Sequence, residues 1–367
     1  MRKALALLLA SSMALSLTAC GGSAASSAAP AGSTPAGSTP AGSTPAASAA
    51  DADDFHIDLK FSNVFQPTEW NYKASEKFAE MVNERSEGHI TVTYYGQNEL
   101  DCYGDSVTQA VHGSNWIGLE QPDLFADYVG DCAVLVGPML YSTDDEYNYL
   151  MDSEPVQDIK ARLAEENIHI LDTHYSFGFR SLVTNRDITE PADLNGVKLR
   201  ATSSALYTKT LEAMGAIATP MSFTECLSAI SAGVVEGFEG STSTLAGAGA
   251  PYELVKKVAL TNHLIATRWL FMGEDVYQSI PEKYRTILDE AAVECGKWEQ
   301  TSCAEDEANQ KAMLAENGVT WNEVDLDAFT EACAPVYDWI VEEYEGVNPD
   351  LHQELVTLIK DYRASKA

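Results

Sequence analysis

Three arginines in one stretch of the chain are the side chains best suited to binding an anion. Arg180, Arg186 and Arg200 fall between residues 178 and 241 of a 367-residue chain whose formal net charge is −32. Arg180 and Arg200 stand among apolar neighbours, where a strand would carry them into or against a core. A buried guanidinium persists only when an anion pairs with it, and its planar fork of donors suits a carboxylate. The stretch therefore predicts a pocket for an organic acid.

Structural roles for the same arginines compete with this interpretation. Arg200 could form a salt bridge to Glu239 or Glu236 that pins strands together, and Arg180 could be structural too. Arg186 precedes an aspartate in an expected loop, which favours a surface or structural pair.

The elements around these arginines alternate between strands and helices. Strands are predicted at residues 197–202, 216–220 and 234–238, separated by helices at 203–214 and 222–232. Gly215 is a preferred left-handed helix stop, and Ser222 with Glu225 has capping-box spacing. Such alternation predicts a parallel sheet, whose ligand crevice lies at the carboxyl ends of the strands. Arg200 falls at or near such an end.

A second unit of the same kind precedes this stretch. Strands are predicted at 57–61, 89–95 and 116–119, with helices at 68–86 and 105–113. We therefore expect two similar α/β lobes, roughly 55–175 with later C-terminal segments, and roughly 176–270. The loops at 62–67 and 120–124 would face the pocket from the side opposite Arg180 and Arg200.

The remaining chain, residues 281–367, is predicted to be helical. Long helices are expected at 281–317 and 326–344, and a last one with Asn348 as its cap and Pro349 at its first position. Pro335 predicts a kink or break in the second of them.

The N-terminal residues are predicted to lie outside the fold. Residues 1–20 have the charged start, short apolar run and Leu-Thr-Ala-Cys ending of a lipoprotein signal peptide, with Cys20 as the lipidated residue. A plain secretory peptide is the alternative. Residues 21–52 are built mainly of Ala, Gly, Ser, Thr and Pro, which predicts a disordered tether. The solute-binding fold is then expected over residues 53–367.

Several motifs resemble one transport family. The first of these motifs consists of Arg180, Arg186 and the run PADLNGVKLR that ends at Arg200. It is followed by Met-Gly-Ala at 214–216, Pro-Met-Ser-Phe-Thr-Glu at 220–225 and Thr-Asn-His at 261–263. In this order the motifs resemble the solute-binding subunits of tripartite ATP-independent periplasmic (TRAP) transporters, the DctP-like family. The resemblance covers roughly residue 57 to the C-terminus. It implies an α/β, two-lobed extracytoplasmic solute-binding fold with long bracing C-terminal helices.

The resemblance also implies roles for individual residues. Arg200 matches the family's main carboxylate clamp, Arg180 a second arginine near the ligand acid, Phe223 a pocket-wall aromatic and Glu120 a polar position of the first lobe.

One position departs from the family pattern. The family commonly has an asparagine where this chain has Gly240, so either Ser241 substitutes or the ligand sits differently. Trp269 is a further candidate, since a bulky or aromatic acid would suit it. Arg268 could reach the pocket as well, or be an exposed arginine beside a core tryptophan.

Other function classes find little support in the sequence. The negative charge disfavours nucleic-acid binding, and motifs of the common hydrolases, nucleotide-binding and dinucleotide-binding enzymes are missing. Histidines and cysteines lack metal-ligand spacing, so neither a metal nor a cofactor is expected. The cysteines are expected to be buried thiols, with one disulfide as the alternative.

The sequence thus predicts a lipid-anchored extracytoplasmic protein that performs no chemistry. It would close on an organic acid and deliver it to a TRAP membrane permease, as the resemblance implies. Two alternatives stay open: a protein that presents its ligand to a membrane sensor kinase, and a surface hydrolase of an acidic polymer.

Overall fold

The structure, a computed structural model, describes residues 54–366. The expected signal peptide, Cys20 and the expected tether lie outside the described residues. None of the helices within residues 54–366 combines the length and the apolar composition that a membrane crossing requires.

The described residues are organised around one nine-stranded mixed sheet. Its strand order is β2-β1-β3-β8-β4-β7-β5-β6, with β9 paired to β8. The strands are β1 (Ile57–Ser62), β2 (Ile90–Tyr95), β3 (Trp116–Glu120), β4 (Ile168–Thr184), β5 (Lys198–Ala201), β6 (Ile217–Pro220), β7 (Gly237–Gly240), β8 (Lys257–Gly273) and β9 (Thr320–Asn322).

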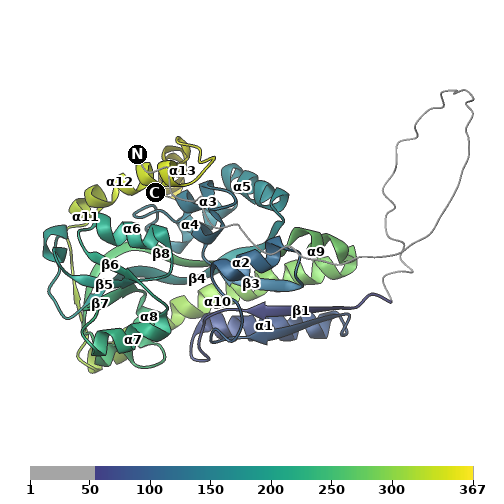
Figure 1. Cartoon of the computed structure of the whole chain (residues 1–367), viewed down its shortest axis with the longest axis horizontal. Helices are drawn as coiled ribbons and strands as arrows, with labels where there is room; N and C mark the ends of the chain where they lie inside the picture. Colours follow the sequence, from purple (N-terminus) through teal and green to yellow (C-terminus); the bar gives the residue numbers. More distant parts are fainter. Residues whose placement is uncertain (1–53, 367) are drawn as a thin grey trace, which may run out of the picture. The chain divides into compact units, whose positions relative to one another are not determined.

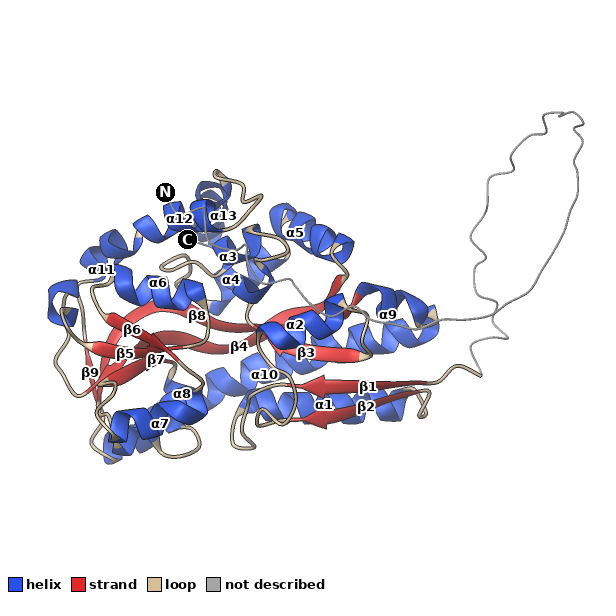
Figure 2. Cartoon of the chain, in the orientation of Figure 1, coloured by secondary structure: helices blue, strands red, loops and turns tan. Residues whose placement is uncertain are grey.

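Both predicted βαβαβ units are present, and each forms a parallel group of strands. The first lobe is built on β1, β2 and β3, and the second on β5, β6 and β7. The long antiparallel strands β4 and β8, each of 17 residues, run between them and join both groups in one sheet (Figures 1 and 2). These two strands had not been predicted. Because they pass through both lobes, residues on them can reach the space between the lobes.

Helices cover both faces of the sheet. They are α1 (Trp70–Arg85), α2 (Gly104–Val111), α3 (Asp131–Leu135), α4 (Asp144–Met151), α5 (Glu154–Glu165), α6 (Ala205–Ala213), α7 (Phe223–Ser231), α8 (Thr242–Ala246), α9 (Glu274–Ser279), α10 (Glu282–Glu316), α11 (Leu326–Cys333), α12 (Pro335–Glu343) and α13 (Leu351–Lys366). In Figure 2, α1, α7, α8 and α10 lie on one side of the sheet and α3 to α6 with α11 to α13 on the other. Separate hydrophobic clusters fill the two layers.

The C-terminal helices brace the sheet as predicted. Helix α10, 35 residues long, packs against α1 of the first lobe, β4, and α8 of the second. The predicted break at Pro335 is confirmed, because α11 ends at Cys333 and α12 begins at the proline. The last helix begins at Leu351, later than predicted, because the backbone N–H of Asn348 bonds to Asp131 and its side chain accepts a hydrogen bond from Asp350.

Strand β7 begins at Gly237, three residues later than predicted, at a close backbone approach to β4. A Cβ atom at Gly237 would lie 2.0 Å from the carbonyl oxygen of Val183 on β4, so only glycine fits where the two strands meet. This register brings Glu239, near the end of β7, opposite Leu182 and next to Arg180.

Candidate functional site

A pocket lies between the two lobes and encloses about 700 Å³ of space, part of it open to solvent. We call it the interlobe pocket. Its lining residues come from both lobes and from the joining strands: Val64, Phe65, Gln66, Glu69, Asn98, Tyr103, Phe177, Arg180, Arg200, Thr202, Ser222, Phe223, Thr224, Thr244 and Arg268. The structure therefore brings together three of the residues predicted from the sequence, Arg180, Arg200 and Phe223.

Arg200 is buried in the pocket wall and forms no ion pair with any carboxylate of residues 54–366. It is 3 % exposed and comes from the end of β5. Its Nε donates to the carbonyl of Met221 at 2.9 Å, and its guanidinium lies over the Phe223 ring, 5.5 Å from the centre. Burial lowers the pKa of Arg200, and the charge of Glu239 opposes this only in part. An anionic ligand would supply the missing counter-charge.

Arg180 is buried as well, but its charge is already paired. Its Nε and one terminal nitrogen donate to the two carboxylate oxygens of Glu239, and that nitrogen also donates to the Glu239 carbonyl at 3.0 Å. Burial lowers the pKa of Arg180, but the Glu239 carboxylate raises it by more. The structural role considered for Arg200, a salt bridge to Glu239, thus belongs to Arg180. The other candidate partner, Glu236, pairs with Arg186.

Phe223 lies in the pocket wall because it is the first residue of α7. The predicted capping box is present: the side chains of Ser222 and Glu225 each bond to the other's backbone N–H. The start of this helix, residues 222–224, therefore faces the pocket. A helix N-terminus presents backbone N–H groups and a positive dipole end, which favour an anion.

Arg268 is a pocket residue that was weighed in the sequence but not selected. It is 6 % exposed, and its guanidinium lies over two rings, 5.6 Å from the centre of Phe65 and 5.2 Å from that of Phe177. One terminal nitrogen donates to the carbonyl of Thr267 at 2.7 Å. No carboxylate of residues 54–366 forms an ion pair with it. An arginine inside an otherwise mainly apolar strand was the signal available in the sequence.

Comparisons with known proteins agree with this geometry. The family described as bacterial extracellular solute-binding protein, family 7 (DctP) matches residues 61–344. The chain belongs to this family.

Solved structures of TRAP periplasmic solute-binding proteins share its fold. The protein from Desulfovibrio salexigens, in complex with diglycerolphosphate, is 36 % identical with a TM-score of 0.82, covering 85 % of this chain and 99 % of its own. The Fusobacterium nucleatum protein, with bound sn-glycerol 3-phosphate, is 31 % identical with a TM-score of 0.81, covering 84 % and 98 %. The Actinobacillus succinogenes protein, with bound L-galactonate, is 27 % identical with a TM-score of 0.77, covering 83 % and 100 %. The predicted TRAP-type, DctP-like assignment and α/β solute-binding fold are confirmed.

In this family 7 protein, Glu120 lies behind the pocket wall. It is buried at the end of β3, and its carboxylate accepts a hydrogen bond from the backbone N–H of Tyr103. Tyr103 lines the pocket with a φ of 57°, a left-handed value that is unfavourable for a bulky residue. Glu120 therefore holds Tyr103 in place.

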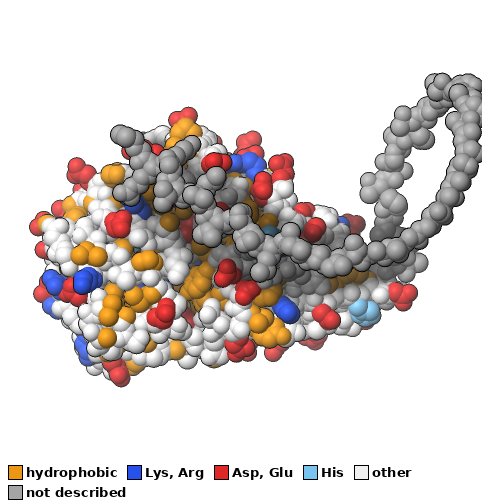
Figure 3. All heavy atoms as spheres, viewed as in Figure 1, with side chains coloured by type: hydrophobic (Ala, Val, Ile, Leu, Met, Phe, Trp, Pro, Cys, Tyr) orange, Lys and Arg blue, Asp and Glu red, His pale blue; other side chains and the backbone are white. Residues whose placement is uncertain are grey.

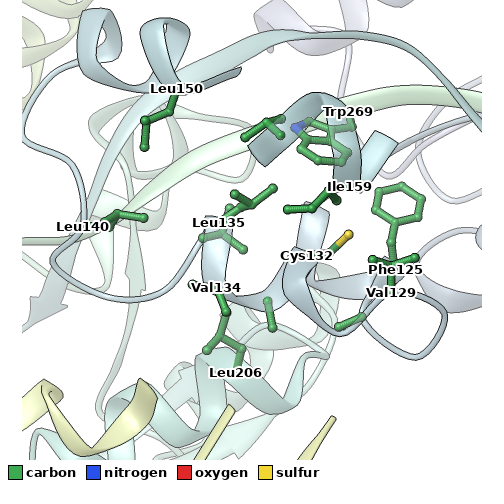
Figure 4. Packing of buried hydrophobic residues seen from close by; sticks show 14 of the residues in the cluster. Phe125, Val129, Cys132, Val134, Leu135, Leu140, Leu150, Ile159, Leu206 and Trp269 are labelled. Carbon is green, nitrogen blue, oxygen red and sulfur yellow. The ribbon is translucent and has the colours of Figure 1, made fainter. Parts of the chain in front are cut away.

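Trp269 does not line the interlobe pocket. Its side chain is fully buried in the core, where Nε1 donates to the Tyr147 hydroxyl at 2.8 Å and the ring stacks on Phe125. Figure 4 shows it among apolar side chains that include Ile159. Successive side chains of a strand point to opposite faces, so Arg268 faces the pocket and Trp269 the core.

Ser241 also lies outside the interlobe pocket. Its hydroxyl accepts a hydrogen bond from the backbone N–H of Thr244 and caps α8, and the residue lines neighbouring cavities. A Cβ atom at Gly240 would lie 3.0 Å from the ring of Phe238, which packs edge-on against Phe223. A side chain at residue 240 would thus require Phe238 to move.

The cysteines within residues 54–366 are buried, free thiols, in keeping with the first of the two sequence alternatives. They are Cys102, Cys132, Cys226, Cys295, Cys303 and Cys333. Acidic side chains are scattered over the face of the molecule that Figure 3 shows. The pocket arginines Arg180, Arg200 and Arg268 are buried.

Buried carboxyl groups are expected to make the folded protein less stable as the pH rises. Burial raises the pKa of Glu69 and Glu120 to about 7 and that of Glu299 to about 8. Between pH 4.5 and these values the folded state holds protons that the unfolded state has released. The free energy of unfolding therefore falls with rising pH, by about 1.4 kcal/mol per pH unit for each such group. Urea denaturation at pH 5.5 and pH 8 measures this fall.

Glu299→Gln should flatten this pH dependence. Glu299 accepts hydrogen bonds from Asn71 and from the backbone N–H of Ser176, and an amide cannot titrate. We expect the variant's free energy of unfolding to change less with pH, by about 1 kcal/mol per pH unit below pH 8. Glu294→Gln, at an exposed pair with Arg85, is the control. Parallel profiles for Glu299→Gln and the wild type would contradict the expectation.

Proposed function

We propose that this TRAP-type binding protein captures a small organic acid between its two lobes and delivers it to a membrane permease. One observation carries the proposal: Arg200 is buried in the interlobe pocket without a carboxylate partner. A buried guanidinium without a counter-ion raises the free energy of the ligand-free protein, and binding of an anion removes this cost. Arg180 assists, since one of its terminal nitrogens forms no hydrogen bond within residues 54–366. Phe223 and Tyr103 complete the walls.

The acid group of the ligand is a carboxylate or a phosphate. The similar protein from Actinobacillus succinogenes holds a sugar acid, whereas those from Desulfovibrio salexigens and Fusobacterium nucleatum hold phosphate esters. Both groups suit bidentate hydrogen bonding by arginine. The matching family and the similar solved structures are solute-binding proteins, so the proposal is binding and release.

Closure of the lobes is the step that would couple binding to transport. The pocket walls come from both lobes, so an anion held by Arg200 also contacts the first lobe when they approach. Excluding water lowers the local dielectric constant and strengthens the charge pair. The closed form is then the state that the permease recognises. We further propose that the protein acts outside the cytoplasm, held at the membrane by a lipid on Cys20.

A thermal-shift screen of the purified protein against a library of carboxylates and phosphate esters tests this function. A ligand at a hundred times its dissociation constant adds about 2.7 kcal/mol to the free energy of unfolding. We expect at least one acid to raise the melting temperature while its neutral alcohol analogue does not. A library without any stabilising acid would contradict the proposed function.

A further inference from the structure

We infer that Arg268 and Arg200 form a two-sided clamp on one phosphate monoester group, so that the solute is a dianionic organophosphate. This inference rests on the proposed function and deepens it by naming the ligand class and a second anchoring residue. It follows from the arrangement of the pocket's charged groups.

Arg200 and Arg268 have similar surroundings: each guanidinium lies over an aromatic ring, one in the second lobe and the other in the first. Arg200 lies over Phe223, the first residue of α7 in the second lobe. Arg268 lies over Phe65, which follows β1 in the first lobe, and over Phe177 of β4. An aromatic ring covers the face of each guanidinium, so the nitrogens along its edge are what a ligand can reach. In each arginine one nitrogen donates to a backbone carbonyl, and within residues 54–366 the other nitrogens form no hydrogen bond or ion pair.

The charges of both cations act on one residue of the pocket wall, Tyr103. Burial raises the pKa of this tyrosine, while the charges of Arg200 and Arg268 both lower it. An anion bound between these two guanidinium groups would supply the counter-charge that no ion pair with a carboxylate of residues 54–366 gives them.

Neighbouring carboxyl groups are committed elsewhere. Glu120 accepts from the backbone N–H of Tyr103, Asp123 from the hydroxyl of Ser204, and Glu299 from Asn71 and Ser176. None of these carboxyl groups forms an ion pair with Arg268, although their negative charge acts on it from a distance.

The pocket's own charge then favours a dianion. Arg180 is neutralised by Glu239, which leaves Arg200 and Arg268 as the two unpaired cations of the lining. Glu69 is the lining carboxyl, and burial keeps it partly protonated near pH 7. A carboxylate would neutralise one cation. A phosphate monoester carries about −1.5 to −2 charges at pH 7 and three acceptor oxygens, enough for both guanidinium groups.

Further donors surround the place where such a group would lie. The second-lobe wall adds the hydroxyls of Thr202 and Thr224 and the N-terminus of α7. A phosphate needs more donors than two arginine edges provide, and a helix N-terminus is a common source. On the first lobe, Glu69 and Asn98 are suited to the hydroxyl groups of a polyol skeleton.

Calorimetric titration with matched ligands tests the inference. The probes are sn-glycerol 3-phosphate with glycerate, glucose 6-phosphate with glucuronate, and diglycerolphosphate as a phosphate ester with a single charge. We expect a monoester to bind at least 10-fold more tightly than its matched carboxylate and than the diester. Arg268→Gln should weaken monoester binding by about 10- to 100-fold, but carboxylate binding by less than threefold.

Two further variants keep the result interpretable. Arg268→Lys keeps the charge and is expected to retain part of the preference for the monoester. Arg186→Gln removes an exposed arginine outside the pocket and should leave every affinity unchanged. Denaturation curves of each ligand-free variant show whether it is folded. If Arg268→Gln is not folded, Arg268→Lys provides the test, because it should weaken binding of the monoester more than binding of the carboxylate.

The outcomes separate this inference from the proposed function. Tighter binding of a carboxylate or of the diester, or an equal loss for all ligands in the Arg268 variants, would overturn the phosphate clamp and leave acid capture standing. If no probe or library acid binds the wild type, both fail.

Discussion

Glu239→Ala is expected to lower the free energy of unfolding by about 3–5 kcal/mol, the typical cost of removing one partner of a buried ion pair. Glu239 is fully buried and bonds to two nitrogens of Arg180, itself 4 % exposed. His263 cannot replace it, because an imidazole is never an anion; burial and the charge of Arg180 lower the pKa of His263 to about 3, which keeps it neutral. Without the carboxylate, Arg180 is a buried cation without a counter-ion. Urea denaturation at pH 7 measures the loss.

An exposed pair in the same lobe provides the matched control. Arg186 and Glu236 are joined at 2.6 Å at the protein surface, where ion pairs contribute about 0–1 kcal/mol. Glu236→Ala should therefore change the free energy of unfolding by less than about 1 kcal/mol. The double variant Arg180→Met with Glu239→Leu should recover much of the stability lost in Glu239→Ala. A cost below 1 kcal/mol for Glu239→Ala would show that the pair is not the structural link we describe.

Arg200→Gln is expected to weaken binding of the solute by about 100-fold or more, because a buried charge pair is lost on ligand binding. The same substitution should leave the ligand-free protein as stable as before or more stable, since it removes a cation that no described carboxylate pairs with. Calorimetric titration with the acid found by screening measures the affinity, and urea denaturation the stability.

This pair of effects separates a ligand-binding arginine from a structural one. Arg180→Gln should behave in the opposite way, with a large loss of stability, because it leaves Glu239 buried without its partner. If Arg200→Gln destabilised the empty protein by several kcal/mol and left the affinity unchanged, Arg200 would be structural and the proposed function would lose its main support. Arg186→Gln serves as the control in both measurements.

The contrast between Arg180 and Arg200 also relates stability to function. Two arginines of similar burial line one pocket, yet one has its counter-ion built into the fold and the other does not. The first joins β4 to β7. Under the proposed function the second raises the free energy of the empty pocket and a bound anion removes that cost, so we expect affinity to be gained where stability of the empty protein is given up.

Local sequence signals were sufficient for most of the helices and short strands. The capping box at Ser222 and Glu225, the stop at Gly215 and the break at Pro335 each depend on neighbouring residues, so the elements they delimit could be predicted. The position of Arg200 at the end of β5 followed from the same reasoning. The family motifs, read in order, predicted the TRAP-type fold.

The tertiary structure decided which charged side chains pair and which face the pocket. Strand β7 lies between β4 and β5 in the sheet, which brings Glu239 near both arginines, and Glu239 bonds to Arg180 across 59 residues of sequence. The pairing of β4 with β8 and its register shifts decided that Arg268 faces the pocket and Trp269 the core. Helices and turns depend on contacts within a few residues, whereas the counter-ion of a buried charge depends on strand order and register, which no local pattern specifies.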